Sequence, residues 1–117
     1  MSVNVSDFDR SKTFYRAALA PLGYAVVMEF DKNAGFAIGN TPDFWIGEGK
    51  PNVPPVHVAF AAASHVEVDA FYRAAIAAGA TDNGRPGPRP HYHEHYYGAF
   101  VRDPDGHNIE ACCHLPE

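Results

Sequence analysis

The sequence lacks the features that mark several large classes of protein. No apolar run approaches the roughly 18 to 20 residues that span a membrane, and the opening segment MSVNVSDFDR has no basic region followed by an apolar stretch. The nine Lys and Arg residues are scattered and the formal net charge is −5. No basic stripe is therefore available to neutralise a run of phosphates. We expect no membrane partner, no nucleic-acid partner and a cytoplasmic location.

Cysteine is also scarce. The only two, Cys112 and Cys113, are adjacent near the C-terminus. Successive side chains of a strand point to opposite faces, so these two are poor partners for a mutual disulfide. We expect one in a cavity wall and one in the core, both reduced, which suits a cytosolic chain. A reactive or metal-binding pair is the alternative.

What the chain does contain is an internal repeat. FYRAALA at residues 14–20 returns as FYRAAIA at residues 71–77, an offset of 71 − 14 = 57 in a chain of 117 residues. Each copy follows a strand-like run and precedes three short alternating segments separated by turn residues. The repeat therefore predicts strand, helix and three strands, twice. We expect a single domain over residues 1–117, with module one at about 1–50 and module two at about 55–115.

Both copies carry helix start and stop signals. An acidic residue follows Ser6 and Ser64 at the spacing of a capping box, and Gly23 and Gly79 stand where the helices should end. One such unit leaves an open, curved sheet with an uncovered face. Two units can bury their helices together and curl their sheets around a shared cavity. The pattern predicts an α+β fold with pseudo-twofold symmetry.

Three segments resemble a known family: VSDFDRSKTFY at the first helix, VHVAF at the first strand of module two, and YYGAFVRDPDGHNIEA at the final hairpin. The chain is similar to the vicinal oxygen chelate superfamily of glyoxalase I, extradiol dioxygenases, and fosfomycin and bleomycin resistance proteins. The resemblance implies two βαβββ modules that form a curved sheet cup for a small-molecule ligand. It also implies a homodimer and, in many members, a divalent metal such as Zn, Ni, Mn or Fe.

The resemblance assigns metal binding to His57 and Glu110, in the first and last strands of module two. Alternation along PVHVAF places His57 on the same face as Ala59, over the cavity, while Val58 and Phe60 take the other face. A structural or substrate-contacting role without a metal is the alternative for both residues.

The internal repeat predicts what module one contributes. At an offset of 57 the counterpart of His57 falls before Met1, and the counterpart of Glu110 falls near Trp45 or Ile46. Neither Trp nor Ile binds a metal. We therefore expect two candidate ligands where better-known members of the family have three or four, and catalytic sites usually supply three.

The segment HYHEH presents His91, His93 and His95 at alternate positions, directly after GRPGPRP. The prolines and glycines favour a loop over a regular strand, with a substrate-contacting lid or a metal ligand as alternatives. His93 is our choice for a third ligand or a general base, because Tyr92 and Tyr96 flank it. An imidazole with its ordinary pKa of about 6.5 suits either task.

Other side chains are candidates for contact with a ligand. Trp45, Tyr92 and Tyr97 are expected to line an apolar cup that binds a bulky molecule. Arg102 is expected to hold an anionic group, with a surface ion pair as the alternative. His107, in the DPDG turn, is expected to be exposed.

Two functions follow. The first is a glyoxalase-like protein acting on a small molecule by metal-assisted lyase, isomerase or dioxygenase-type chemistry, with Glu110 and His93 as catalytic residues. The second is a metal-free protein of the bleomycin-resistance type that sequesters a small molecule. The first is the leading hypothesis, and the absent histidine of module one and the presence of Trp45 are arguments for the second. A structural dimer with a degenerate site is a third reading.

Overall fold

The computed structural model describes residues 1–116 and contains two similar modules. Module one consists of β1 (Ser2–Val5), α1 (Phe8–Leu19), a short 3-10 helix η1 (Ala20–Leu22), β2 (Ala25–Phe30), β3 (Asn33–Ala37) and β4 (Phe44–Glu48). Module two consists of β5 (His57–Ala61), α2 (His65–Ala77), β6 (Thr81–Pro88), β7 (Tyr97–Arg102) and β8 (Asn108–Cys113). The predicted order of strand, helix and three strands is confirmed in both.

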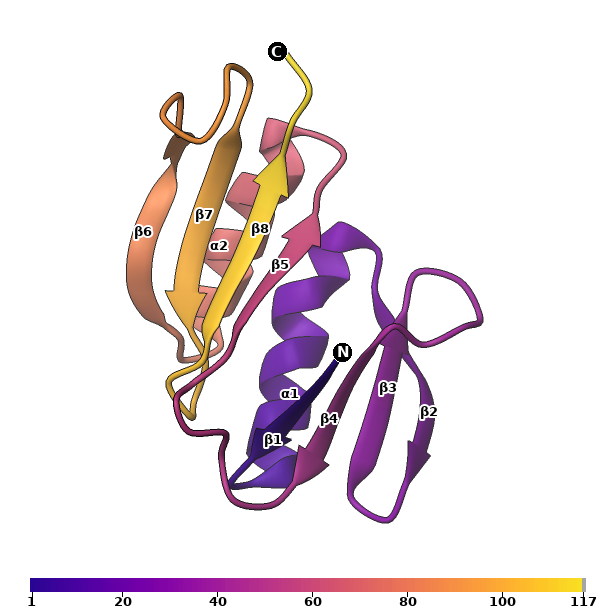
Figure 1. Ribbon diagram of the computed structural model, residues 1–117. Helices are drawn as coiled ribbons and strands as arrows, with labels where there is room; N and C mark the ends of the chain where they lie inside the picture. The colour runs from indigo at the N-terminus through magenta and orange to yellow at the C-terminus, as the bar shows by residue number, and fades with distance from the viewer. Residues whose placement is uncertain (117) are drawn as a thin grey trace.

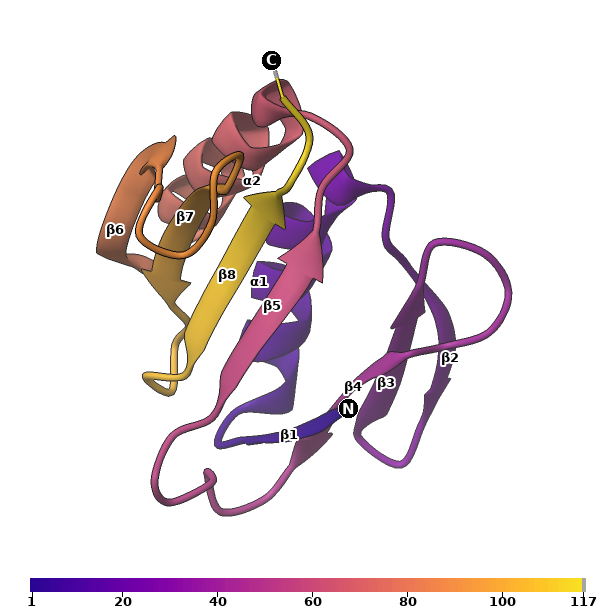
Figure 2. The ribbon, with the colours of Figure 1, turned by 45° about the horizontal axis from the view of Figure 1, so that its top comes forward.

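Each module forms one four-stranded sheet, with the strand orders β1-β4-β3-β2 and β5-β8-β7-β6. The first strand of each module runs parallel to the last, and the remaining pairs are antiparallel. Figures 1 and 2 show both helices on one side of the sheets, which leaves the opposite face of each sheet open. We call this open side the cup face. Within the described part of the chain, no helix is long and apolar enough to cross a membrane.

The helices of both modules are buried in one shared core. Alternate residues of β5, Val58 and Phe60, face this core, while the residues between them are exposed on the cup face. Phe14 of α1 and Phe71 of α2 belong to the same apolar cluster. Phe44 of module one packs edge-to-face on Phe60 of module two, with ring centroids 5.1 Å apart. Burial of this large apolar surface is what joins the modules.

A polar joint also connects the modules at the DPDG turn. His107, expected at the surface, is fully buried: its Nδ1 accepts from the backbone N–H of Val56 at 3.1 Å, and its Nε2–H donates to the carbonyl of Asn4 at 3.1 Å. The prediction of an exposed His107 was wrong because the sequence identifies the turn but not what packs on it. In the same turn, Asp103 accepts a short hydrogen bond from the hydroxyl of Tyr15. Burial and the Asp103 carboxylate raise the pKa of Tyr15 well above its ordinary value.

The first helix begins one residue later than predicted. Asp7, not Ser6, caps α1 by accepting the backbone N–H of Arg10 at 3.1 Å. Ser6 instead donates its hydroxyl to Asp105 in the turn of module two, so the inter-module joint uses the side chain that the pattern assigned to a cap. Ser64 caps α2 as predicted, by accepting the backbone N–H three residues further on.

Candidate functional site

A carboxylate, an imidazole and a phenol meet on the cup face of module two. β5 and β8 pair in parallel, which brings His57 beside Glu110. Glu110 is only 2% exposed. Its Oε1 lies 2.9 Å from Nε2 of His57, and its Oε2 accepts a short hydrogen bond from the hydroxyl of Tyr96. The side chain of His57 is 53% exposed. A buried carboxylate with both oxygens engaged therefore holds a solvent-facing imidazole in one orientation.

Tyr96 was missed as a site residue by the sequence analysis. It precedes β7, where Gly98 and Phe100 lie opposite Cys112 and Glu110 of β8. A Cβ atom on Gly98 would lie 3.1 Å from the ring of Tyr96 and 3.5 Å from Oε2 of Glu110. The absence of a side chain at Gly98 leaves room for the Tyr96 ring. Alternation traced back from Phe100 is the signal that could have found it.

The histidine-rich segment is a loop, as predicted, and the ring of His93 packs edge-to-face on that of Tyr96, with centroids 5.4 Å apart. Nε2 of His93 makes a short hydrogen bond with Nδ1 of His114, and the two rings stack with centroids 4.5 Å apart. Nε2 of His114 faces the sulfur of Cys112 at 3.7 Å. Because His114 uses Nδ1 towards His93 and Nε2 towards Cys112, the two nitrogens point in different directions. One cation therefore cannot be bound by His93, His114 and Cys112 together. His91 and His95 are exposed.

The two cysteines have the different environments that were predicted. Cys112 is 6% exposed on the cup face, whereas Cys113 is fully buried with Val68 and Ala99, and neither is in a disulfide. Burial, together with the negative charge of Glu110, raises the pKa of the Cys112 thiol to about 11. The thiol is therefore neutral at physiological pH and a weak nucleophile.

Two of the expected ligand contacts lie elsewhere. Tyr97 faces α2, where it stacks on His65 with centroids 3.8 Å apart and donates its hydroxyl to Asp69 at 2.8 Å. It therefore does not line the cup. Arg102 stands at the end of β7 and donates to the carbonyl of Gly106 at 2.9 Å. This bond holds its guanidinium at the turn.

A pocket of about 350 Å³ opens beside the His57–Glu110 pair. Its lining residues come from β6, β7, β8 and the loop that follows β6: Asn83, Gly84, Arg89, Tyr92, Phe100 and Asn108. The ring of Phe100 lies 6.3 Å from that of His57, and the guanidinium of Arg89 lies 5.5 Å from the Phe100 centroid. Tyr92 thus lines a pocket next to the candidate site, and Phe100 connects the two.

Strand register identifies the counterpart of His57 in module one. Val3 and Val58 are the first buried residues of β1 and β5, and each pairs with a buried isoleucine of the last strand. The residue before Val3 is Ser2, so Ser2 corresponds to His57. The repeat offset of 57 predicted this counterpart before Met1. That position was wrong because the first strand and the connection to the helix are each one residue longer in module two, so the offset of 57 between the helices does not apply to the first strands.

The counterpart of Glu110 in module one is Gly47, since each follows the isoleucine of its last strand. The sequence analysis had placed it one or two residues earlier. A Cβ on Gly47 would lie 2.5 Å from Oδ1 of Asn33. The Asn33 amide therefore fills the space that a longer side chain would need, and it is anchored by a 2.9 Å bond to the carbonyl of Asp31. Module one offers neither an imidazole nor a carboxylate at these positions.

The donors present do not fit a metal centre with three protein ligands. Among residues 1–116, no group of three or more His, Cys, Asp and Glu side chains is placed to hold a cation. His57 and Glu110 provide two donors, Tyr96 occupies the second oxygen of Glu110, and His93 turns to His114. Catalytic metal sites usually draw three ligands from the protein. The site is therefore a carboxylate–imidazole–phenol cluster.

Two βαβββ modules around one core, with an acid and an imidazole on their open face, define a protein of the vicinal oxygen chelate class. The chain belongs to the Glyoxalase/Bleomycin resistance protein/Dioxygenase superfamily, whose family model matches residues 1–111. The resemblance inferred from the sequence motifs is confirmed.

Solved structures share the fold over nearly the whole chain. A glyoxalase/bleomycin resistance protein from Albidiferax ferrireducens is 32% identical, with 97% of this chain and 95% of that one covered and a TM-score of 0.75. The fosfomycin resistance protein FosX from Mesorhizobium loti is 18% identical, with 98% and 89% covered and a TM-score of 0.72, which shows the fold alone. No curated protein matches the chain significantly.

Proposed function

We propose that this chain is a glyoxalase-type enzyme that moves a proton on a small molecule, with His57 as the base. The observation that carries the proposal is the buried carboxylate of Glu110, 2.9 Å from the half-exposed imidazole of His57. With Nε2–H donating to Glu110, Nδ1 is the ring atom that accepts a proton. The carboxylate stabilises the imidazolium that forms, and Tyr96 holds the carboxylate in place.

The reaction class follows from the groups beside His57. The amides of Asn83 and Asn108 line the adjoining pocket and hydrogen-bond to each other at 3.0 Å. Such amides can donate to an oxygen that gains negative charge when a proton leaves the neighbouring carbon. The substrate class is therefore a small carbonyl compound with a hydrogen on the adjacent carbon. If that carbon also carries a hydroxyl group, delivery of the proton to the former carbonyl carbon, with loss of the hydroxyl proton to form the new carbonyl group, gives an isomerase; if the enolate instead expels a leaving group from the next carbon, the enzyme is a lyase.

Hydrogen exchange provides the test. The wild-type protein should speed deuterium uptake from D₂O into the carbon next to the carbonyl of hydroxyacetone or phenylpyruvate, followed by proton NMR. His57→Gln and Glu110→Gln should each lower the enzymatic rate about 100-fold or more, because a positioned general base contributes roughly that much. His95→Gln is the matched control, since His95 is exposed in the loop and does not contact Glu110.

Two results would contradict the proposal. Equal exchange rates for the wild-type protein and His57→Gln would remove His57 as the base. Loss of exchange in EDTA, with recovery only on addition of zinc, nickel, manganese or iron, would make His57 and Glu110 metal ligands completed by donors outside this chain.

Sequestration of a bulky molecule is the second candidate, and the cup face of module one favours it. The ring of Phe30, which is 53% exposed, lies 5.9 Å from that of Trp45, and Met28 beside them is 48% exposed. These two rings pack edge-to-face at an interplanar angle of 69°, and exposed aromatic side chains of this kind bind flat apolar ligands. Saturable quenching of the single tryptophan, Trp45, by bleomycin without any exchange activity would support sequestration.

The proposal includes a homodimer and a cytoplasmic location. β2 is an edge strand that pairs only with β3, and Val27 and Ile38 next to this edge are 40% and 59% exposed. An open edge flanked by apolar side chains is suited to pairing with a second copy. The free thiols of Cys112 and Cys113 suit a reducing compartment.

A further inference from the structure

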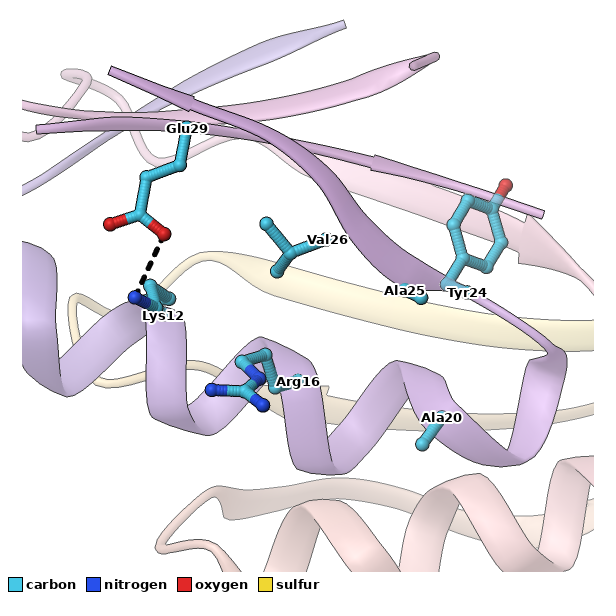
Figure 3. A pocket seen from close by; sticks show the side chains of 7 residues that line it. All are labelled: Lys12, Arg16, Ala20, Tyr24, Ala25, Val26 and Glu29. Carbon is cyan, nitrogen blue, oxygen red and sulfur yellow. Dashed lines mark hydrogen bonds and ion pairs between the residues drawn. The ribbon is translucent and has the colours of Figure 1, made fainter. Parts of the chain in front are cut away.

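A second pocket lies on the helix side of module one, away from the cup face. It has a volume of about 390 Å³ and separates α1 from the edge strand β2. Lys12, Arg16 and Ala20 line it from the helical side, and Tyr24, Val26 and Glu29 line it from the β2 side (Figure 3). We call it the α1–β2 pocket. Nothing in the chemistry proposed for His57 uses it.

The charges in the α1–β2 pocket do not cancel. Nζ of Lys12 lies 2.9 Å from Oε1 of Glu29, so these two charges offset each other. Arg16 stands one helical turn further along α1 and points into the same space (Figure 3). Within residues 1–116 its guanidinium has neither a hydrogen bond nor an ion pair. One positive charge, with all its donors available, therefore remains in the pocket.

The rest of the pocket wall is apolar. Val26 of β2 and Ala20 of η1 both line the pocket (Figure 3). Tyr24 directs its hydroxyl to Asp43, 3.3 Å away, which leaves mainly the ring to line the pocket. A guanidinium binds a carboxylate or phosphate through two parallel hydrogen bonds. The pocket thus combines an anion-binding head group with an apolar wall.

We propose that the α1–β2 pocket binds a small organic anion, with its carboxylate or phosphate on Arg16 and its apolar body against Val26 and Tyr24. This site is separate from the His57–Glu110 cluster and does not depend on the proposed enzymatic function. Arg73 provides an internal reference, because it occupies the same position of the FYRAA repeat in α2 and is exposed. Arg73 does not line the α1–β2 pocket, which Arg16 does.

Amide NMR of the ¹⁵N-labelled protein tests the proposal with four probes: acetate, phenylacetate, inorganic phosphate and phenyl phosphate. Phenylacetate, phenyl phosphate or both should shift the amides of Arg16, Ala25 and Val26 saturably at millimolar concentration. Arg16→Gln should weaken this binding at least tenfold, whereas Arg73→Gln should leave it unchanged. Glu29→Gln should tighten it severalfold, because it removes the only negative charge in the pocket.

The probes separate the chemical sources of the anion. Tighter binding of phenylacetate than of phenyl phosphate identifies a carboxylate ligand, and the reverse identifies a phosphate ester. Equal affinities for each aromatic probe and its small counterpart would refute the role of Val26 and Tyr24. The site itself would be refuted if no probe gave saturable shifts there, or if Arg16→Gln bound as tightly as the wild type with an unchanged melting temperature.

Discussion

At the scale of the residue, Glu110 and Cys112 on one strand show how the surroundings of a side chain determine what it can do chemically. Both belong to β8 and both are almost completely buried on the cup face. Glu110 accepts hydrogen bonds from His57 and Tyr96. Cys112 instead lies next to that carboxylate, which disfavours a second negative charge. The cluster therefore contains an acceptor for His57 but no reactive thiolate.

The raised pKa of Cys112 predicts a loss of stability at alkaline pH. In the unfolded chain the thiol ionises near its ordinary pKa of 9.0, whereas in the folded protein its pKa is about 11. The folded state therefore keeps a proton that the unfolded state releases, and the free energy of unfolding should fall between about pH 9 and 11. Urea unfolding at pH 8 and pH 10.5 measures this fall.

The variant Cys112→Ala isolates the thiol from other groups, such as Tyr15, whose pKa is also raised. Its stability should fall less steeply with pH than that of the wild type, because it has no thiol at this position to ionise on unfolding. Identical slopes for the two proteins would show that the Cys112 thiol has the same pKa in both states.

At the scale of elements, the hairpin of β3 and β4 depends on a close approach at Gly35. A Cβ at this position would lie 2.9 Å from Cβ of Pro42 and 3.0 Å from the ring of Trp45. Gly35 is buried between these groups on the cup face. The ring of Trp45 can therefore pack against β3 only because Gly35 has no side chain.

Gly35→Ala should destabilise the protein by about 1–3 kcal/mol, the usual cost of overpacking a closely packed site. Gly39→Ala is the control, because a Cβ there meets no atom within 4 Å. It should change the free energy of unfolding by about 0.5 kcal/mol or less. Urea titrations followed by circular dichroism provide the comparison. Equal stabilities of the two variants would mean that the sheet relaxes without cost at Gly35.

The sequence predicted the element order well because each element has its own local signal. Two other features depend on contacts between distant parts of the chain: which residue caps a helix, and which face of a strand points to the cup. Ser6 fits the cap pattern of α1 but binds Asp105 instead. In YYGAFVR, a shift of one residue exchanges the two faces of the strand, so Tyr97 was assigned to the cup when Tyr96 occupies it. His57 and Glu110 were assigned to the cup face correctly because the motifs VHVAF and NIEA fix which residues of each strand point to that face.

At the scale of the whole molecule, the two modules share a core but differ in chemistry. Module two has the imidazole and the carboxylate, whereas module one has Ser2 and Gly47 at the matching positions. The cup face of module two therefore carries the polar cluster, and the cup face of module one carries the aromatic side chains. This division could not be read from the repeat, because the matching positions follow from strand register and not from a constant offset.

The proposed homodimer gives a prediction at this scale. Light scattering should give about twice the 12.7 kDa of one chain. Val27→Lys adds a charge beside the open edge of β2 and should shift the mass towards that of a monomer, because a buried lysine at an interface is costly. Val66→Lys is the control: Val66 is 69% exposed on α2, far from this edge in the chain. A wild-type mass of one chain would refute the dimer.

The polar joint between the modules also bears on how the chain folds. The bonds from Asn4 to His107, from Ser6 to Asp105 and from Tyr15 to Asp103 connect residues that are 103, 99 and 88 positions apart. Each requires closure of most of the chain before it can form, and folding slows as the sequence separation of contacts increases. During synthesis, β1 and α1 are made long before the turn that completes them. The pairing of β1 with β4 needs module one alone, whereas the polar contacts of Asn4, Ser6 and Tyr15 can form only after the end of module two has been made.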